Sequence, residues 1–322
     1  MISARFRSTA LRSLAALIPL CLIAASDPPP AAPGPGDIIA AAPAGHWTRI
    51  APEDLLVMEL APDAAGKPRR VVIQLLPAPF SAGWVENIRT LASAHWWDNL
   101  AIVRVQDNYV VQWGDPDGED EAKARPLPAA VRPVPEAQYT HQRSLPRPRA
   151  LDPLFIPAND MNRWTSFYQG FPIAGTGTPD SEANWPVHCY GMVGVGRNLS
   201  PDTGSGAELY TVIGHAPRHL DRNIALVGRV VEGIEHMSSL PRGTGPLGFY
   251  ETAEERTMIR SVRLATELSE AERPRLEYLA SDSESFLRYA EARANRKDAF
   301  FNIPAGGADI CNIPVPIRKV AP

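Results

Sequence analysis

Short segments rich in apolar and β-branched residues, separated by turns and loops, are the feature that most constrains the fold of this chain. Residues 55–60 and 71–76 flank a Gly-Lys-Pro turn, which predicts a β-hairpin. Between positions 100 and 113 the apolar residues recur with a period of two. Further strand-like segments lie at 190–195, 208–213, 224–231 and 258–264. So many short strands predict a mainly β fold, either a barrel or a sandwich.

Helices are few in this prediction. A stripe of apolar residues with helical spacing predicts one helix over 80–92, and Ser81 is placed to cap it. A second amphipathic helix is predicted over 283–296. The 33 prolines among 322 residues are about twice ordinary usage and exclude a fold built mainly of long helices. The formal net charge of −4 argues against a surface for nucleic acid.

The first 26 residues have the pattern of a secretory signal peptide. Arg5, Arg7 and Arg12 precede an apolar run at 14–23, and small residues follow at 24–26. The run is short for a bilayer span, and an uncleaved membrane anchor is the alternative. The pattern therefore predicts an exported, periplasmic protein with no membrane span after cleavage.

Cleavage near Ser26 leaves Cys189 and Cys311 as the only thiols of the mature chain. Export places them in an oxidising compartment, where two cysteines can form a disulfide. The sequence does not show whether their Cα atoms approach within the roughly 4.4–6.8 Å that a disulfide requires. A disulfide and two separate buried thiols are therefore both open.

Two candidate metal sites do not fit their motifs. Acidic residues at 115–121 surround Gly118, but an EF-hand calcium loop has its glycine at the sixth position, so a solvated acidic turn is expected. His215 and His219 are four residues apart, but Pro217 between them argues against the helix on which such zinc ligands lie. The sequence thus predicts no metal site.

One predicted strand carries an arginine in its centre. The alternation places one face of that strand at Ile102, Arg104 and Gln106, and the other face at Ala101, Val103 and Val105. Period alone favours a solvated arginine on the outer face of a sheet, because such positions are common where only one face is buried. A functional role for Arg104 needs further support.

That support comes from three groups of motifs in order along the chain. The first is V-V-I-Q-L at 71–75 with V-E-N-I-R at 85–89, and the second runs from W-D-N-L at 97–100 to Y-V-V-Q-W-G-D at 109–115. The third joins H-L-D at 219–221 to V-G-R-V-V-E-G at 227–233. Together they resemble the cyclophilin family of peptidyl-prolyl cis–trans isomerases, whose signatures are E-N-F-R, Y-D-G-L-x-F-H-R-V, F-M-x-Q-G-G-D and L-D-x-x-x-x-x-F-G-x-V-x-x-G.

The resemblance implies an eight-stranded closed barrel capped by two helices, with an active groove on its outer face. It assigns residues 46–268 to the barrel, including a long Pro-rich loop insertion at 117–181 with one short ordered piece around 162–168. Residues 269–322 form a C-terminal extension that holds the second predicted helix. Residues 27–45, rich in Pro, Ala and Gly, are predicted to be a spacer because they can bury little apolar surface.

The resemblance also assigns site residues. Arg104 corresponds to the catalytic arginine of the family, and Gln112 to the glutamine that helps to place it. The implied substrate-binding residues are those at the proline pocket and its rim, namely Tyr109, Val110, Glu208, Tyr210, His219 and Leu220.

Several of these positions depart from the family pattern. Glu208 replaces a substrate-contacting glutamine, and His219 replaces an aromatic residue at the pocket rim. Arg197 stands where an asparagine usually contacts the substrate backbone, and Ile224 where a histidine is common. These changes imply an altered pocket and weak turnover.

The chemistry implied by the resemblance needs neither nucleophile, metal nor cofactor. Rotation about a peptide bond faces a barrier of about 18–20 kcal/mol because amide resonance is lost, and an X-Pro bond favours trans only slightly. An apolar pocket and a charged donor that stabilises the twisted amide are sufficient. The expected partners are unfolded or proline-containing polypeptides. The alternative function is a non-catalytic binding or chaperone module for proline-containing segments.

Overall fold

The computed structural model describes residues 32–320, except 144, 147, 156–163, 177–182 and 299. The predicted signal peptide at 1–26 and the start of the predicted spacer lie outside the described residues. Among the described residues, no helix is both long enough and apolar enough to cross a membrane.

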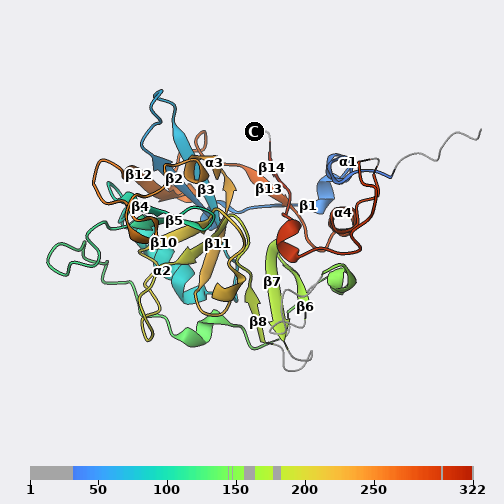
Figure 1. Cartoon of the computed structure of the whole chain (residues 1–322), viewed down its shortest axis with the longest axis horizontal. Coiled ribbons are helices and arrows are strands. Elements are labelled where there is room, and N and C mark those ends of the chain that lie inside the picture. The colour runs from blue at the N-terminus through green and yellow to red at the C-terminus, as the bar shows by residue number, and fades with distance from the viewer. Residues whose placement is uncertain are drawn as a thin grey trace, which may run out of the picture. The chain divides into compact units, whose positions relative to one another are not determined.

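Eight antiparallel strands close into a barrel, as the resemblance implies (Figure 1). The order around the barrel is β10-β5-β4-β12-β2-β3-β11-β9, and β9 pairs with β10 to complete the ring. The strands are β2 (Leu55–Leu60), β3 (Arg69–Leu75), β4 (Ala101–Val105), β5 (Val110–Gly114), β9 (Met192–Val195), β10 (Leu209–Val212), β11 (Leu226–Glu232) and β12 (Thr257–Leu264). The mainly β fold class and the closed barrel are therefore confirmed.

Helix α2 (Ala82–Ser93) covers the barrel with the predicted apolar stripe, because Trp84, Ile88 and Leu91 are fully buried in the core. Ser81 precedes this helix as expected, but its φ of 49° is left-handed and its side chain makes no capping hydrogen bond. The second helix against the barrel is a single turn, α3 (Glu235–Ser238).

Short 3₁₀ turns complete the connections, at Ala44–His46, Pro52–Asp54, Glu136–Tyr139, Arg149–Leu154, Arg218–Leu220, Pro246–Gly248, Ala265–Glu267 and Ile310–Asn312.

The predicted loop insertion at 117–181 contains more regular structure than expected. Strands β6 (Trp164–Tyr168) and β7 (Phe171–Thr176) lie within it, and together with β8 (Ala183–Pro186), which follows it, they form a separate three-stranded antiparallel sheet. Gln169 and Gly170 both have positive φ, 46° and 79°, so they form the tight two-residue connection that a β-hairpin favours. The expectation of a single short ordered piece was wrong. Glutamine is not a residue type that predicts a positive φ, and the prolines on both sides of these strands interrupt the alternating pattern.

The predicted spacer is also corrected where the structure describes it. Helix α1 (Pro35–Ala40) lies beside helix α4 (Glu284–Ala294), the helix predicted over 283–296, and buries Ile38 (Figure 1). Local composition suggested a chain with nothing to bury, but the partner surface comes from a helix some 250 positions later.

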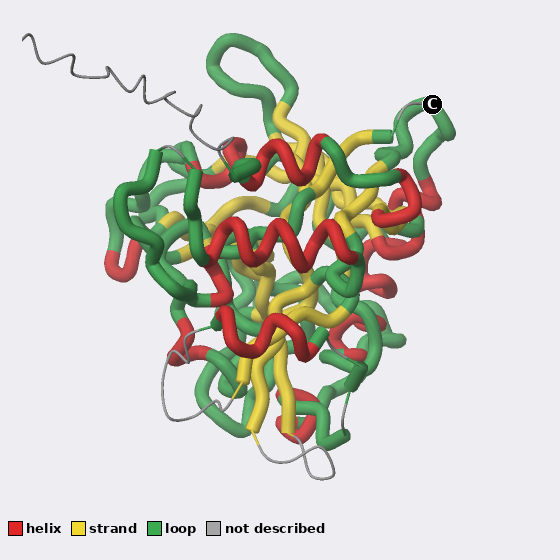
Figure 2. Tube along the Cα trace, turned by 90° about the vertical axis from the view of Figure 1, so that its right-hand side faces the viewer, coloured by secondary structure: helices red, strands yellow, loops and turns green. Residues whose placement is uncertain are grey.

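The C-terminal extension contributes strands as well as a helix. β13 (Leu276–Leu279) lies between β1 (Trp47–Arg49) and β14 (Ile317–Lys319) in a third sheet, so the first strand of the predicted barrel segment pairs outside the barrel. Helix α4 packs on the insertion, with the rings of Phe286 and Phe167 4.9 Å apart between centroids. Figure 2 views the molecule from the right-hand side of Figure 1, and from this side the helices lie across the strands.

A disulfide joins Cys189, just before β9, to Cys311 in the extension. This settles the alternative left open by the sequence in favour of a pair. The bond connects the barrel to the C-terminal extension across 122 positions of sequence.

Arg229 on β11 connects the barrel to both other sheets. Its guanidinium donates to Gln74 Oε1 at 2.8 and 3.0 Å and to the Gly170 carbonyl at 2.6 Å, and it lies over the rings of Phe171 and Tyr278. Only 8 % of the residue is exposed. Burial lowers the pKa of Arg229 to about 10, with the nearby Tyr278 opposing the shift.

We expect Arg229→Ala to lower the free energy of unfolding by about 3 kcal/mol, because two buried oxygen acceptors lose their donors and the side chain leaves a cavity. Urea denaturation followed by tryptophan fluorescence measures this change. Arg260→Ala, at an exposed position on β12, is the matched control and should change stability by less than about 0.5 kcal/mol. Equal effects of the two substitutions would contradict the connecting role of Arg229.

Candidate active site

A groove of about 690 Å³ lies against the outer face of β4, β5 and β10. Residues from two long connections, 115–127 and 196–208, form its walls, and Phe249 and Tyr250 close one side. A groove of this size fits an extended stretch of a few amino acids.

Strand register explains why distant residues meet in this groove. Arg104 on β4 pairs with Gln112 on β5, Gln112 pairs with Tyr210 on β10, and Tyr210 pairs with Gly194 on β9. Residues that are direct neighbours across antiparallel strands project on the same side of the sheet. The row therefore places one charged, one polar and one aromatic side chain side by side.

The strand that carries Arg104 does not alternate as predicted. A bulge between Ile102 and Arg104 shifts the register, so Val103 and Arg104 both line the groove while Ile102 and Val105 belong to the buried core. The expectation that Ile102 and Arg104 share one face was wrong. Bulges are common next to functional sites because the extra residue redirects a side chain.

Three hydrogen bonds hold the Arg104 guanidinium. Nε donates to the Leu247 carbonyl at 2.7 Å, Nη1 donates to Gln112 Oε1 at 3.1 Å, and Nη2 donates to Gln106 Oε1. The rings of Tyr109 and Phe249 lie 5.6 and 5.1 Å from its central carbon. An arginine has five N–H donors, so two have no partner among the described residues.

Burial lowers the pKa of Arg104 below its ordinary value, although Tyr109 and Glu208 oppose the shift. An arginine remains a cation at neutral pH even after such a shift, because its ordinary pKa is far above 7. The groove therefore contains a fixed, partly buried positive charge, with two N–H donors that no described residue accepts from.

An apolar pocket adjoins this charge. Val110, Tyr210 and Val212 form a small buried cluster on β5 and β10, and Tyr109 and Ile224 pack against it. Leu220, from the 3₁₀ turn Arg218–Leu220, also lines the groove. A proline ring bound here would be removed from water and would pack against the side chains of this cluster, which favours binding.

Glu208 occupies a narrow place beside the pocket. Added Cβ atoms at Gly114 and Gly196 would each lie 3.1 Å from its Cγ, so these two glycines make room for it. Burial raises the pKa of the Glu208 carboxyl, the hydrogen bond with Gln112 opposes the shift, and Glu119 and Asp115 add to it. The carboxylate is therefore destabilised in the folded protein.

This shift predicts a pH-dependent effect of Glu208→Gln. A carboxyl with a raised pKa in the folded state stabilises the fold least once it is ionised, so the wild type loses stability as pH rises from the ordinary glutamate range through the raised pKa. The glutamine variant has no such loss. We therefore expect the Tm of the variant minus that of the wild type to increase from pH 4 to pH 7 by differential scanning calorimetry. Glu86→Gln, at an exposed position on α2, is the control, and a difference that does not vary with pH would refute the assignment.

The structure brings seven of the eight predicted site residues to this one groove and leaves one out. Its lining includes Arg104, Gln112, Tyr109, Val110, Glu208, Tyr210 and Leu220, together with the two departing positions Arg197 and Ile224. His219 is exposed and is not among the lining residues. Successive side chains of a 3₁₀ turn point about 120° apart, so Leu220 faces the groove while its neighbour His219 does not.

Sequence reasoning missed the segment around Pro246–Gly248. Leu247 supplies the carbonyl that accepts from Arg104, and Phe249 forms an isolated antiparallel bridge with Arg104. No motif marks these residues, because a backbone carbonyl contact leaves no trace in residue type. Gln106 had a signal, its spacing of two from Arg104.

The acidic segment at 115–121 forms a turn, and its carboxylates accept hydrogen bonds from backbone amides. Asp115 accepts from the amides of Asp117 and Arg125, and Asp120 accepts from Ala122. Within the part of the chain that the structure describes, no group of three or more His, Cys, Asp or Glu side chains could hold a metal ion.

Comparisons with known proteins agree with this geometry. The family model described as cyclophilin type peptidyl-prolyl cis-trans isomerase/CLD matches residues 69–264, more than half of the chain. Comparison with curated protein sequences gives no significant match.

A solved cyclophilin structure shows the same fold. Cyclophilin AquaCyp293 from Hirschia baltica is 21 % identical, covers 86 % of this chain and 95 % of its own, and superposes with a TM-score of 0.62. A cyclophilin-type isomerase from Cryptosporidium parvum, solved in the presence of the dipeptide Ala-Pro, is 9 % identical, covers 65 % of this chain and 98 % of its own, and has a TM-score of only 0.36. The barrel and the family match over 69–264 together show that the chain belongs to the cyclophilin-type peptidyl-prolyl cis–trans isomerases, a family of enzymes that isomerise X-Pro peptide bonds.

Proposed function

We propose that this protein isomerises X-Pro bonds of exported polypeptides, with Arg104 as the catalytic group and Gln112 as the residue that orients it. The observation that carries the proposal is the position of Arg104, which lines the same groove as Val110 and Tyr210 of the apolar cluster. A proline ring in that cluster would have its imide nitrogen next to a fixed cation.

The proposed mechanism is stabilisation of the twisted amide. When the C–N bond rotates, conjugation is lost and the lone pair is localised on the proline nitrogen. The two remaining N–H donors of Arg104 can interact with this lone pair only in the twisted state, so they lower the barrier more than they stabilise the planar substrate. Leu247, Gln112 and Gln106 hold the guanidinium in place, so it need not reorganise during the reaction.

Export is the second part of the proposal. The signal-peptide pattern of residues 1–26 and the Cys189–Cys311 disulfide both support an oxidising compartment outside the cytoplasm. Expression of the full chain followed by cell fractionation and N-terminal sequencing would test it. We expect a mature form that begins near Asp27 in the periplasmic fraction, and an intact chain in the cytoplasm would contradict it.

A non-catalytic module that binds proline-containing segments is the second candidate. It is favoured by the departures at Glu208, Arg197 and Ile224, which alter the walls of the groove. Such a module would hold the proline ring without accelerating rotation.

One experiment separates the two functions. The cis–trans exchange rate of a short X-Pro peptide is measured by NMR exchange spectroscopy with and without catalytic amounts of protein, and binding of the same peptide is measured by titration. Faster exchange supports the isomerase. Binding without faster exchange supports the module, and the absence of both would refute the assignment of the groove as a proline site.

A further inference from the structure

We propose that His188 is a positioning residue for this groove, which acts by holding the hydroxyl of Tyr210 away from the proline pocket. The inference rests on the proposed function, since the pocket matters only if proline binds there. His188 itself lies outside the groove lining and is completely buried.

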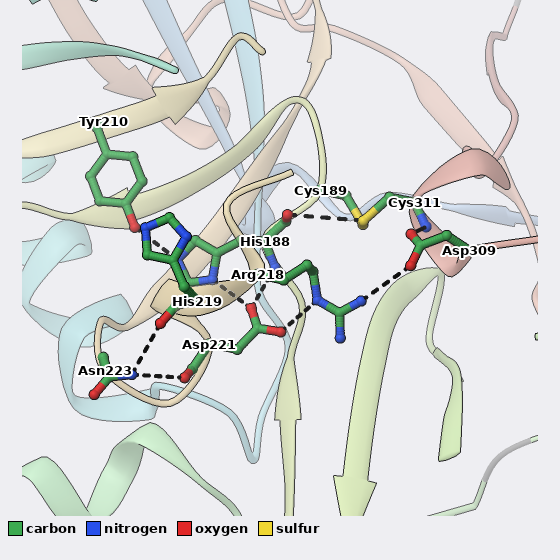
Figure 3. Close-up of polar contacts among 9 residues, drawn as sticks. All are labelled: His188, Cys189, Tyr210, Arg218, His219, Asp221, Asn223, Asp309 and Cys311. Atoms are coloured by element: carbon green, nitrogen blue, oxygen red, sulfur yellow. Dashed lines mark hydrogen bonds and ion pairs between the residues drawn. A yellow bond between two sulfur atoms is a disulfide. The ribbon is translucent and has the colours of Figure 1, made fainter. Parts of the chain in front are cut away.

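The contact between the two residues is direct. His188 Nε2 and the Tyr210 hydroxyl are 2.8 Å apart, and the two rings are nearly parallel, with centroids 6.3 Å apart and planes at 11° (Figure 3). Burial raises the pKa of Tyr210 well above its ordinary value, so the hydroxyl keeps its proton. A buried phenol of this kind needs a hydrogen-bond partner.

Asp221 fixes the orientation of the histidine ring. Its Oδ1 lies 2.8 Å from His188 Nδ1 and also accepts from the His188 amide at 3.0 Å, while Oδ2 accepts from Arg218 Nε at 2.7 Å. Burial by itself raises the pKa of Asp221, but His188 and Arg218 together lower it below the ordinary value. The ionised carboxylate therefore accepts from Nδ1–H, which in a neutral ring leaves Nε2 to accept from Tyr210.

Gly194 provides the space for this arrangement. It is the cross-strand partner of Tyr210, and a Cβ added there would lie 2.3 Å from both Cζ and Oη of the tyrosine. The tip of the ring therefore passes over a bare backbone to reach His188. The tyrosine ring stays beside Val110 and Val212 as part of the pocket, and its polar end is directed elsewhere.

The C-terminal extension supports the same network. Arg218 Nη1 lies 3.5 Å from Asp309 Oδ2, Asp309 accepts from the amide of Cys311, and the disulfide returns from Cys311 to Cys189, the neighbour of His188 (Figure 3). Arg218, one of the two residues that hold Asp221, is therefore in contact with the C-terminal extension, and the disulfide ties the extension to the chain next to His188, the other residue. This gives the extension a connection to the groove that the barrel alone would lack.

Loss of His188 should change the conformation of Tyr210 in the pocket. With no partner at its tip, the Tyr210 hydroxyl would be buried and unsatisfied, so rotation of the ring toward the groove, where water is available, becomes favourable. That rotation would place a polar group where the proline ring binds. The defect should therefore depend on the hydroxyl of Tyr210, not on the loss of the imidazole as such.

A double-mutant cycle tests this dependence. We expect His188→Ala to weaken binding of a proline peptide and to raise KM by about ten-fold, the effect of one unsatisfied buried polar group, with a smaller change in kcat. In the Tyr210→Phe background, the same histidine substitution should change peptide affinity and KM by less than about two-fold. His95→Ala, at an exposed position, is the matched control.

The outcomes are separable. A histidine effect that is equally large with tyrosine and with phenylalanine at position 210, or no effect in either background, would overturn the inference. If the wild type binds proline peptides but does not accelerate exchange, the isomerase proposal fails while the peptide affinities still test the role of His188. If His188→Ala does not fold, His188→Phe replaces it in the same cycle, because its ring fills the cavity but offers the Tyr210 hydroxyl no hydrogen-bond partner.

Discussion

Arg104→Ala should reduce kcat/KM for isomerisation of an X-Pro peptide by about 10²–10³-fold, the loss found when one preorganised donor to a transition state is removed. The physical reason is that the two unpartnered N–H groups of Arg104 would act on the twisted amide beside an apolar, water-poor pocket. Peptide affinity should fall much less, because the apolar cluster that binds the ring is unchanged. NMR exchange rates and peptide titration measure the two quantities.

The control variants make this result specific. Arg260→Ala removes an exposed arginine from another barrel strand and should leave the rate unchanged. Arg104→Lys keeps the charge but has only three donors and no planar fork, so it cannot donate to Leu247, Gln112 and Gln106 and also to substrate, and it should recover only a small part of the rate. Equal rates for the wild type and Arg104→Ala would refute the catalytic role of the arginine.

Removal of the Cys189–Cys311 disulfide should lower the free energy of unfolding by about 4 kcal/mol. The bond closes a loop across 122 positions, and a cross-link across so long a loop removes many conformations from the unfolded chain. The double variant Cys189→Ala/Cys311→Ala should show this loss in urea denaturation.

Chemical reduction provides an independent check on the same quantity. A reducing agent should lower the stability of the wild type to about that of the double variant and should have no effect on the variant itself. A stability unchanged by either treatment would show that the cross-link does not support the fold.

Much of the barrel could be predicted from the sequence. Strands such as 55–60 and 258–264 and the helix over 80–92 lie at most two residues from their observed bounds at each end. These elements were accessible because their hydrophobic period is a local property and each has one face turned to the core. The motif W-D-N-L through Y-V-V-Q-W-G-D also placed Arg104 and Gln112 together, because the strands that carry them are adjacent in sequence.

Other parts depended on partners distant in the sequence. Helix α1 exists in a segment poor in large apolar residues because α4 covers Ile38. The sheet of β6, β7 and β8 lies in a Pro-rich stretch whose local pattern is weak. In both cases the stabilising surface is supplied by residues that no local window contains.

The site shows the same division. The sequence by itself indicated the type of chemistry, because the motifs around Arg104 and Gln112 resemble those of the cyclophilin family, whereas the strand period alone favoured a solvated arginine. Only the tertiary structure decided how Arg104 is directed, because the bulge after Ile102 and the Leu247 carbonyl act through backbone geometry. It also decided that His188 meets Tyr210, because that contact needs the bare backbone of Gly194 between them. Local periodicity reports which face of a strand is buried, whereas contacts made by folding back of the chain depend on three-dimensional packing that no single segment encodes.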